Sequence, residues 1–106
     1  MIISFPAESG SINSMIAEDF GSAKYFIVVD TSSLRIEPFS NPSVSSRGGF
    51  QVQLAMMFHK RKVKRLVCCC IDRGARAYLE SRGLEVAEGS FGKVRDAAAA
   101  VSKIIS

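Results

Sequence analysis

Apolar positions along the chain recur with two different periods. Short runs of β-branched and aromatic residues predict strands, whereas apolar residues three or four positions apart predict helices. The segments that read as strands are Met1–Phe5, Tyr25–Val29, Leu34–Phe39, Leu66–Ile71 and Leu84–Ala87. The helical spacing predicts helices from Phe50 to about Arg61, between Asp72 and Gly83, and after Ser90. The predicted order is therefore β-β-β-α-β-α-β-α.

Turn and cap residues indicate how these elements connect. Pro6 is expected to end the first strand, and the short turn at Asp30–Ser33 predicts an antiparallel hairpin. Asp72 and Ser90 are candidate N-caps, and Gly83 is placed for the residue just beyond a helix C-terminus. A hairpin followed by alternating helices and strands predicts an α/β fold, a mixed sheet with helices packed on its faces.

Two loops stand out by length, one spanning residues 7–19 and the other residues 40–49. Loops of this length in compact domains are typically functional or mobile. Gly48 and Gly49 precede one predicted helix, and Arg73 and Gly74 begin another. The backbone N–H groups of a helix start can hold an anion, although such glycines equally well serve tight turns.

The 106 residues suffice for one domain, 1–106, with its own core. The longest apolar run, Leu66–Ile71, is far shorter than the roughly 20 residues that span a bilayer. We therefore expect a cytoplasmic protein that binds no membrane and keeps its cysteines reduced.

The net charge of +4 comes largely from the run Lys60–Arg65, which holds five cations. Cations at a helix C-terminus complement the helix dipole, so a solvated helix end is the first interpretation. The alternative is a surface that binds anions or proteins. Nucleic-acid binding is not expected, because no aromatic residues are interleaved with the run.

Three adjacent cysteines, Cys68, Cys69 and Cys70, follow the apolar strand. Thiolates are ligands for zinc, copper(I) and iron-sulfur centres. On a strand Cys68 and Cys70 face one way and Cys69 the other, and a buried cysteine is often only a small apolar residue. Cys70, nearest the turn, is the best metal-ligand candidate.

Familiar catalytic patterns are absent from the sequence. It has no Walker motif, no dinucleotide-binding fingerprint and no HExxH zinc motif. The single histidine, His59, lies in the basic stretch and away from both long loops, so a Ser-His-Asp triad is hard to build. We expect a non-enzymatic protein.

Several short motifs together resemble the dinitrogenase iron-molybdenum cofactor biosynthesis family of nitrogenase accessory factor-like domains, over nearly the full length. These motifs are Phe20–Phe26, Asn41-Pro42, Ile71–Ala75, Leu79, Gly83–Val86 and Gly89–Val94. The resemblance implies a ribonuclease-H-like three-layer fold with a five-stranded sheet in the order 3-2-1-4-5. It also implies a metal-cluster site beside the first long loop, and cluster donor or acceptor proteins as partners.

The resemblance also bears on individual residues. Family members with a cluster role typically carry a histidine immediately before the Phe-Gly pair, where this chain has Asp19. Nuclease activity is not expected, because a ribonuclease-H-type enzyme needs a carboxylate on its first strand and Met1–Phe5 has none.

The predicted function is therefore a binding or carrier domain for a metal cluster, containing molybdenum, iron or copper, or for a related anionic metal species. The alternative is a protein or small-anion interaction module that has lost metal binding. The predicted metal ligands are Cys70 and Asp19. The predicted cofactor-binding residues are Ser9, Gly10, Asp19, Gly48, Gly49, Arg73 and Gly74.

Overall fold

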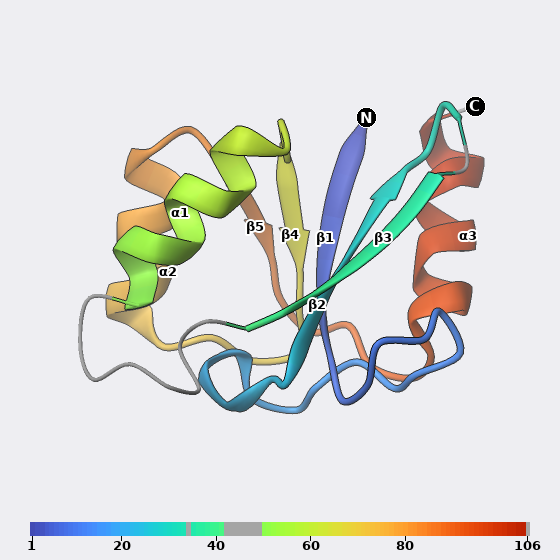
Figure 1. Ribbon diagram of the computed structural model, residues 1–106, viewed down its shortest axis with the longest axis horizontal. Helices are drawn as coiled ribbons and strands as arrows, with labels where there is room; N and C mark the ends of the chain where they lie inside the picture. Colours follow the sequence, from blue (N-terminus) through green and yellow to red (C-terminus); the bar gives the residue numbers. More distant parts are fainter. Residues whose placement is uncertain (34, 42–49, 106) are drawn as a thin grey trace.

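The computed structural model of the protein describes residues 1–33, 35–41 and 50–105, and Figure 1 shows how its elements are arranged. The strands are β1 (Ile2–Ala7), β2 (Tyr25–Asp30), β3 (Arg35–Ser40), β4 (Arg65–Val67) and β5 (Glu85–Ala87). The helices are a 3-10 turn, η1 (Phe20–Ser22), and α1 (Phe50–Lys60), α2 (Arg73–Ser81) and α3 (Val94–Ile105). Apart from the 3-10 turn, the predicted element order is confirmed.

The five strands form one sheet in the order β3-β2-β1-β4-β5, as predicted. The central strand β1 runs antiparallel to β2, with Ile2 opposite Asp30, and parallel to β4, with Ser4 opposite Leu66. β2 and β3 form the expected antiparallel hairpin, and β5 runs parallel to β4. The carboxyl ends of β1, β4 and β5 therefore lie at the same end of the sheet.

Helices cover both faces of the sheet, with α1 and α2 on one face and α3 on the other (Figure 1). Because alternate residues of a strand face opposite ways, β2 supplies Phe26 to the core under α1 and α2 and Ile27 to the core under α3. In the first core the rings of Phe26 and Phe58 meet edge to face, with centroids 5.3 Å apart. The three-layer α/β architecture is confirmed.

Two predicted strand ends are wrong. Pro6 does not end β1 but lies inside the strand. The parallel pairing with β4 covers only Ile3 and Ser4, so the missing N–H of the proline costs no hydrogen bond between these two strands. β4 ends at Val67 rather than Ile71. Beyond Val67 the carbonyls of Cys68 and Cys69 accept hydrogen bonds from the turn that follows β5, and the backbone bends at Cys69.

The predicted cap at Ser90 is also wrong, because α3 begins only at Val94. The backbone N–H of Ser90 donates to the carbonyl of Cys68 instead (3.0 Å). The first N–H groups of α3, on Val94 and Arg95, donate to carbonyls of the loop after β1, each at 2.9 Å. That loop therefore caps the helix in place of a side chain.

No helix in the described part of the chain is long and apolar enough to cross a membrane. Gly48 and Gly49, which were predicted to bind a cofactor, lie outside the described residues.

The C-termini of α1 and α2 end in the same hydrogen-bond pattern. After α1, the N–H of Val63 donates to the carbonyl of Phe58 and the N–H of Lys62 to that of His59. After α2, Leu84 donates to Leu79 and Gly83 to Glu80. These are Schellman motifs, which require a left-handed residue just beyond the helix.

The two motifs differ in the residue that takes the left-handed position. After α2 it is glycine, as predicted, with Gly83 at φ 88°. After α1 it is Lys62 at φ 60°, the one positive-φ residue other than glycine in the described part of the chain. A side chain costs energy in this conformation, whereas glycine adopts it freely.

This difference predicts opposite effects of two substitutions. Lys62→Gly should raise the free energy of unfolding by about 0.5–1 kcal/mol, because glycine relieves the left-handed strain. Gly83→Ala should lower it by about 1 kcal/mol or more, because alanine introduces that strain. Urea denaturation of the two variants measures both changes, and a stabilising Gly83→Ala would contradict the assignment.

Candidate functional site

The structure brings Asp19 and Cys70 together at the carboxyl end of the sheet. The two residues form an isolated parallel bridge, and the backbone N–H of Phe20 donates to the carbonyl of Cys70 at 3.0 Å. This contact follows from the parallel pairing of β1 and β4, which sends the segments after both strands to the same end. Asp19 and Cys70, one with a carboxylate and one with a thiol, thus lie on adjoining segments at the end of the sheet where open α/β folds bind ligands.

Backbone hydrogen bonds hold the loop after β1 in place. The N–H of Ala17 donates to the carbonyl of Pro6, and the N–H of Ile16 to the carbonyl of Gly92, each at 2.8 Å. Within the loop, the N–H of Ser9 donates to the buried hydroxyl of Ser14 at 2.9 Å. The loop therefore forms a fixed wall that presents Asp19.

Two predicted residues of this loop lie elsewhere. Gly10 faces Tyr25 of β2 and Pro38 of β3, where an added Cβ would meet the Tyr25 ring at 3.4 Å. In the strand order β2 and β4 flank opposite sides of β1, so Gly10 lies on the side of β1 away from β4. Ser9, its neighbour, uses its N–H to hold the loop. The structure does not bring either residue next to Cys70.

The three cysteines have different environments. Cys68 is fully buried in the core under α1 and α2, and burial, with the nearby carboxylate of Glu88 as the next cause, raises the pKa of its thiol to about 12. Cys69 is half-buried and packs toward the α3 side, and its thiol pKa is raised by burial and then by a hydrogen bond with the Cys70 side chain. Cys70 is exposed. Only Cys70 combines exposure with a place beside Asp19.

The start of α2 already holds a carboxylate. The Asp72 side chain accepts a hydrogen bond from the N–H of Ala75 at 2.9 Å, which confirms Asp72 as the N-cap. The same carboxylate lies over Gly74, 3.4 Å from where a Cβ would be. Arg73 is exposed beside it. An external anion at this helix start would therefore meet the negative charge of Asp72.

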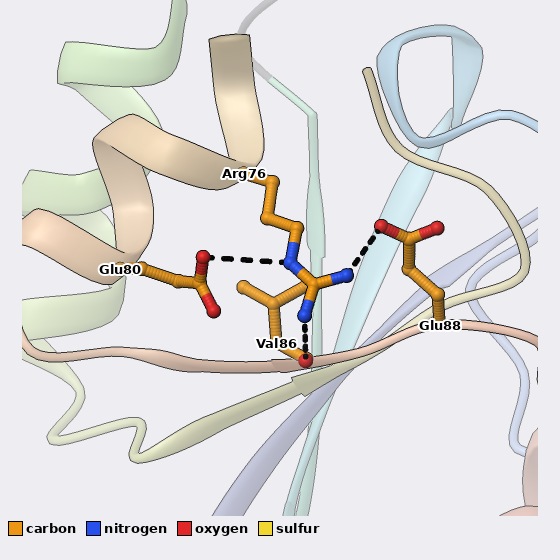
Figure 2. Close-up of polar contacts among 4 residues, drawn as sticks. All are labelled: Arg76, Glu80, Val86 and Glu88. Carbon is orange, nitrogen blue, oxygen red and sulfur yellow. Dashed lines mark hydrogen bonds and ion pairs between the residues drawn. The ribbon is translucent and has the colours of Figure 1, made fainter. Parts of the chain in front are cut away.

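One turn further along α2, the side chain of Arg76 forms hydrogen bonds and ion pairs with neighbouring groups (Figure 2). Its guanidinium contacts Glu88 at 2.8 Å, Glu80 at 3.4 Å and the carbonyl of Val86 at 3.5 Å. The hydrogen bond with Glu88 and the charge of Glu80 raise the pKa of Arg76. Arg76 thus fixes α2 to the segment after β5, and its charge is balanced by two carboxylates.

A polar pocket of about 360 Å³ lies beside Asp19. Its charged lining residues are Glu8, Glu18, Asp19 and Lys24. Sequence analysis missed Glu8, Glu18 and Lys24, although the first two flank the long loop as Asp19 does. A search for carboxylates at the ends of loops would have found Glu8 and Glu18 but not Lys24. The pocket carries more negative than positive charge.

The described residues do not form a complete set of metal ligands. Among them, no three His, Cys, Asp or Glu side chains are grouped closely enough to hold a metal ion. Cys70 and Asp19 offer one soft and one hard donor at an open edge, so a metal held there would keep most of its coordination positions for other ligands. Such a site suits a metal species that brings its own ligands.

Comparisons with known proteins agree with this fold. The family model described as dinitrogenase iron-molybdenum cofactor matches residues 1–104. The crystal structure of PH0822 is similar with a TM-score of 0.83 and 26% identity, over 97% of this chain and 91% of that one. TM1290 from Thermotoga, a NifB-like protein solved by NMR, gives a TM-score of 0.81 and 25% identity over 96% and 87%. The apo form of the orange protein from Desulfovibrio gigas has a TM-score of 0.85 and 23% identity, over 96% of this chain and 87% of that one. Comparison with curated proteins gave no match.

The different environments of the cysteines predict ordered alkylation. At about pH 8, iodoacetamide should modify Cys70 first and Cys68 only after unfolding, because the thiolate is the nucleophile and Cys68 stays a buried thiol. Mass spectrometry of the digested protein measures the modification of each cysteine with time. Equal rates at Cys68 and Cys70 in the folded protein would contradict the structure.

The N-cap predicts a structural role for Asp72. Asp72→Ala should lower the free energy of unfolding by about 1 kcal/mol, because the N–H of Ala75 loses its acceptor. Asp72→Ser should retain most of the stability, since serine also caps helices. Thermal or urea denaturation compares the two variants, and an equal loss in both would assign the effect to charge rather than to capping.

Proposed function

The chain belongs to the dinitrogenase iron-molybdenum cofactor family, and from this premise we propose that it is a non-enzymatic binding or carrier domain for a metal cluster or a related metal species. The cargo is held at the crevice between the loop that ends at Asp19 and the segment that ends at Cys70.

The observation that carries this proposal is the bridge between Asp19 and Cys70. It joins the backbone of Asp19 to that of Cys70, whose thiol is exposed, and the 3.0 Å hydrogen bond from the N–H of Phe20 to the carbonyl of Cys70 supports the same contact. Two protein ligands leave the cargo accessible. A structural metal site would instead enclose its ion with about four protein ligands, so an open two-residue site is better suited to transfer.

The charges around the crevice bear on the cargo. Among the described residues, Glu8, Glu18 and Asp19 line the pocket beside Asp19 together with one cation, Lys24. Asp72 covers the start of α2, and Arg76 is balanced by Glu80 and Glu88. Like charges repel at short range, so these residues favour a neutral or weakly charged metal species over a strongly anionic one.

Exposed apolar side chains near this end of the sheet suit a donor or acceptor protein. Phe91 is 83% exposed, and Met15 is also exposed. They lie on two loops joined by the hydrogen bond from Ile16 to Gly92. A partner that covered these side chains would bury apolar surface close to the cargo.

Metal analysis tests the proposal directly. Protein produced with molybdenum, iron and copper available, or reconstituted anaerobically with them, should carry metal measurable by elemental analysis. Cys70→Ser should weaken loading by about tenfold or more, because the exposed soft ligand is lost. Asp19→Asn should also weaken it, while asparagine keeps an oxygen for the N–H of Gly21.

The matched control is Cys68→Ala, which removes the buried thiol without placing a hydroxyl in the core. It should retain the metal content of the parent protein. Absence of metal under every condition, or equal losses in the Cys68 and Cys70 variants, would refute the proposed site.

A further inference from the structure

A second concave surface lies at the opposite end of the sheet, between the C-terminal halves of α1 and α2. This groove has a volume of about 880 Å³. Residues 62–64 line it just before β4 begins, and residues 82–84 line it just before β5 begins. The Cys70 segment follows the other end of β4, so the groove is separate from the crevice.

The groove combines an apolar floor with a basic rim. Its apolar lining residues are Val52, Ala55, Met56, Phe58, Val63, Tyr78, Leu79 and Leu84. Its rim carries His59, Lys60, Lys62, Lys64 and Arg82. Among the described residues the lining includes no acidic side chain, so the charged residues that border the apolar floor are all lysine or arginine.

The arginines and the lysines of the basic run Lys60–Arg65 have different surroundings. The guanidinium of Arg61 pairs with Glu37 at 3.1 Å, and that of Arg65 pairs with Glu85 at 2.9 Å. Lys60, Lys62 and Lys64 line the groove, and no carboxylate in the described part of the chain is within ion-pair distance of them. The two arginines thus form ion pairs within the fold, whereas the three lysines border an apolar surface without a carboxylate partner in the described part of the chain.

Helix-dipole complementation does not account for all of these lysines. Lys60 is in the last turn of α1, where a cation is favourable. Lys64 lies beyond the helix, and Lys62 occupies the left-handed position that the equivalent turn after α2 gives to Gly83. Lysine at this position makes the fold less stable than glycine would, which indicates that the charge of Lys62 has a function.

We propose that the groove binds a segment of a partner protein in which apolar side chains are flanked by acidic ones. The apolar floor accepts the apolar side chains, and the lysines and Arg82 pair with the carboxylates. Small-molecule sites enclose most of their ligand. Here the apolar surface continues outward onto α1, where Met56 is 67% exposed and Val52 45% exposed, which suits a longer chain.

The test uses a labelled amphipathic helical peptide with leucines on one face and glutamates beside them. A matched peptide carries glutamines in place of the glutamates. Fluorescence anisotropy should show the acidic peptide binding about tenfold more tightly, and the difference should shrink when NaCl is raised from about 0.05 M to about 0.5 M. Equal binding of the two peptides, or none, would overturn the proposal.

Four variants locate the binding surface. The double variant Lys60→Glu/Lys64→Glu and the single variant Met56→Glu should each weaken binding by about tenfold. Lys62→Gly should weaken it while raising the stability of the fold, a combination that misfolding cannot produce. The control Arg95→Glu reverses an exposed cation on α3 and should leave binding unchanged.

Three outcomes would refute this occupant. An equal loss with Arg95→Glu would mean that the peptide senses only the overall charge. Dimerisation of the parent chain that Met56→Glu abolishes, seen by light scattering, would make the groove a contact between copies. Tighter binding of dodecanoate than of the peptide, with displacement of the peptide, would assign the groove to a small amphiphile. None of these readouts depends on metal loading, so failure here leaves the proposed carrier role intact.

Discussion

The pairing of β1 on both of its edges is the constraint on which the rest of the structure depends. Its antiparallel pairing with β2 closes the hairpin side of the sheet, and its parallel pairing with β4 sets the direction of the other side. Parallel neighbours must end at the same edge, so the loop after β1 meets the segment after β4. The bridge between Asp19 and Cys70 and the groove at the other end both follow from this arrangement.

The two ends of the sheet use their charges differently. At the crevice, Asp72 caps a helix, and Arg76 joins α2 to the segment after β5 through two carboxylates. These groups hold the backbone around Cys70 and are not available to a ligand. At the groove, the arginines of the basic run are paired and the lysines are not. Lysine is a strongly hydrated, flexible cation, which suits a surface that meets a mobile partner.

Much of the fold could be predicted from the sequence, because the apolar periods and turn residues agreed with the final packing. Asp72 and Gly83 were assigned correctly, since their cap roles depend on neighbours within a few residues. Pro6 and Ser90 were not, because the end of the β1–β4 pairing before Pro6 and the hydrogen bond from Ser90 to Cys68 depend on residues distant in the sequence. Local signals cannot report such pairings.

At the candidate site too, features set by nearby residues could be predicted and features set by distant residues could not. The exposure of Cys70 agrees with its place nearest the turn, but strand alternation does not explain the three environments, because β4 ends at Val67, before the first cysteine. The displacement of Gly10 toward Tyr25 could not be predicted, since the path of a long loop is set by tertiary contacts. The acidity of the pocket beside Asp19 was not predicted for a related reason. Glu8 and Glu18 can be read from the sequence, but they become neighbours only when the loop folds back.

The two Schellman turns connect local strain with function. They have the same hydrogen bonds and lie at the same end of the sheet, so they differ mainly in the residue at the left-handed position. Gly83 meets the backbone requirement without strain, whereas Lys62 meets it at an energetic cost of about 1 kcal/mol. Packing does not require that lysine, because its side chain is exposed at the rim of the groove. Its charge is therefore the property that distinguishes it from glycine, and the groove is where that charge acts.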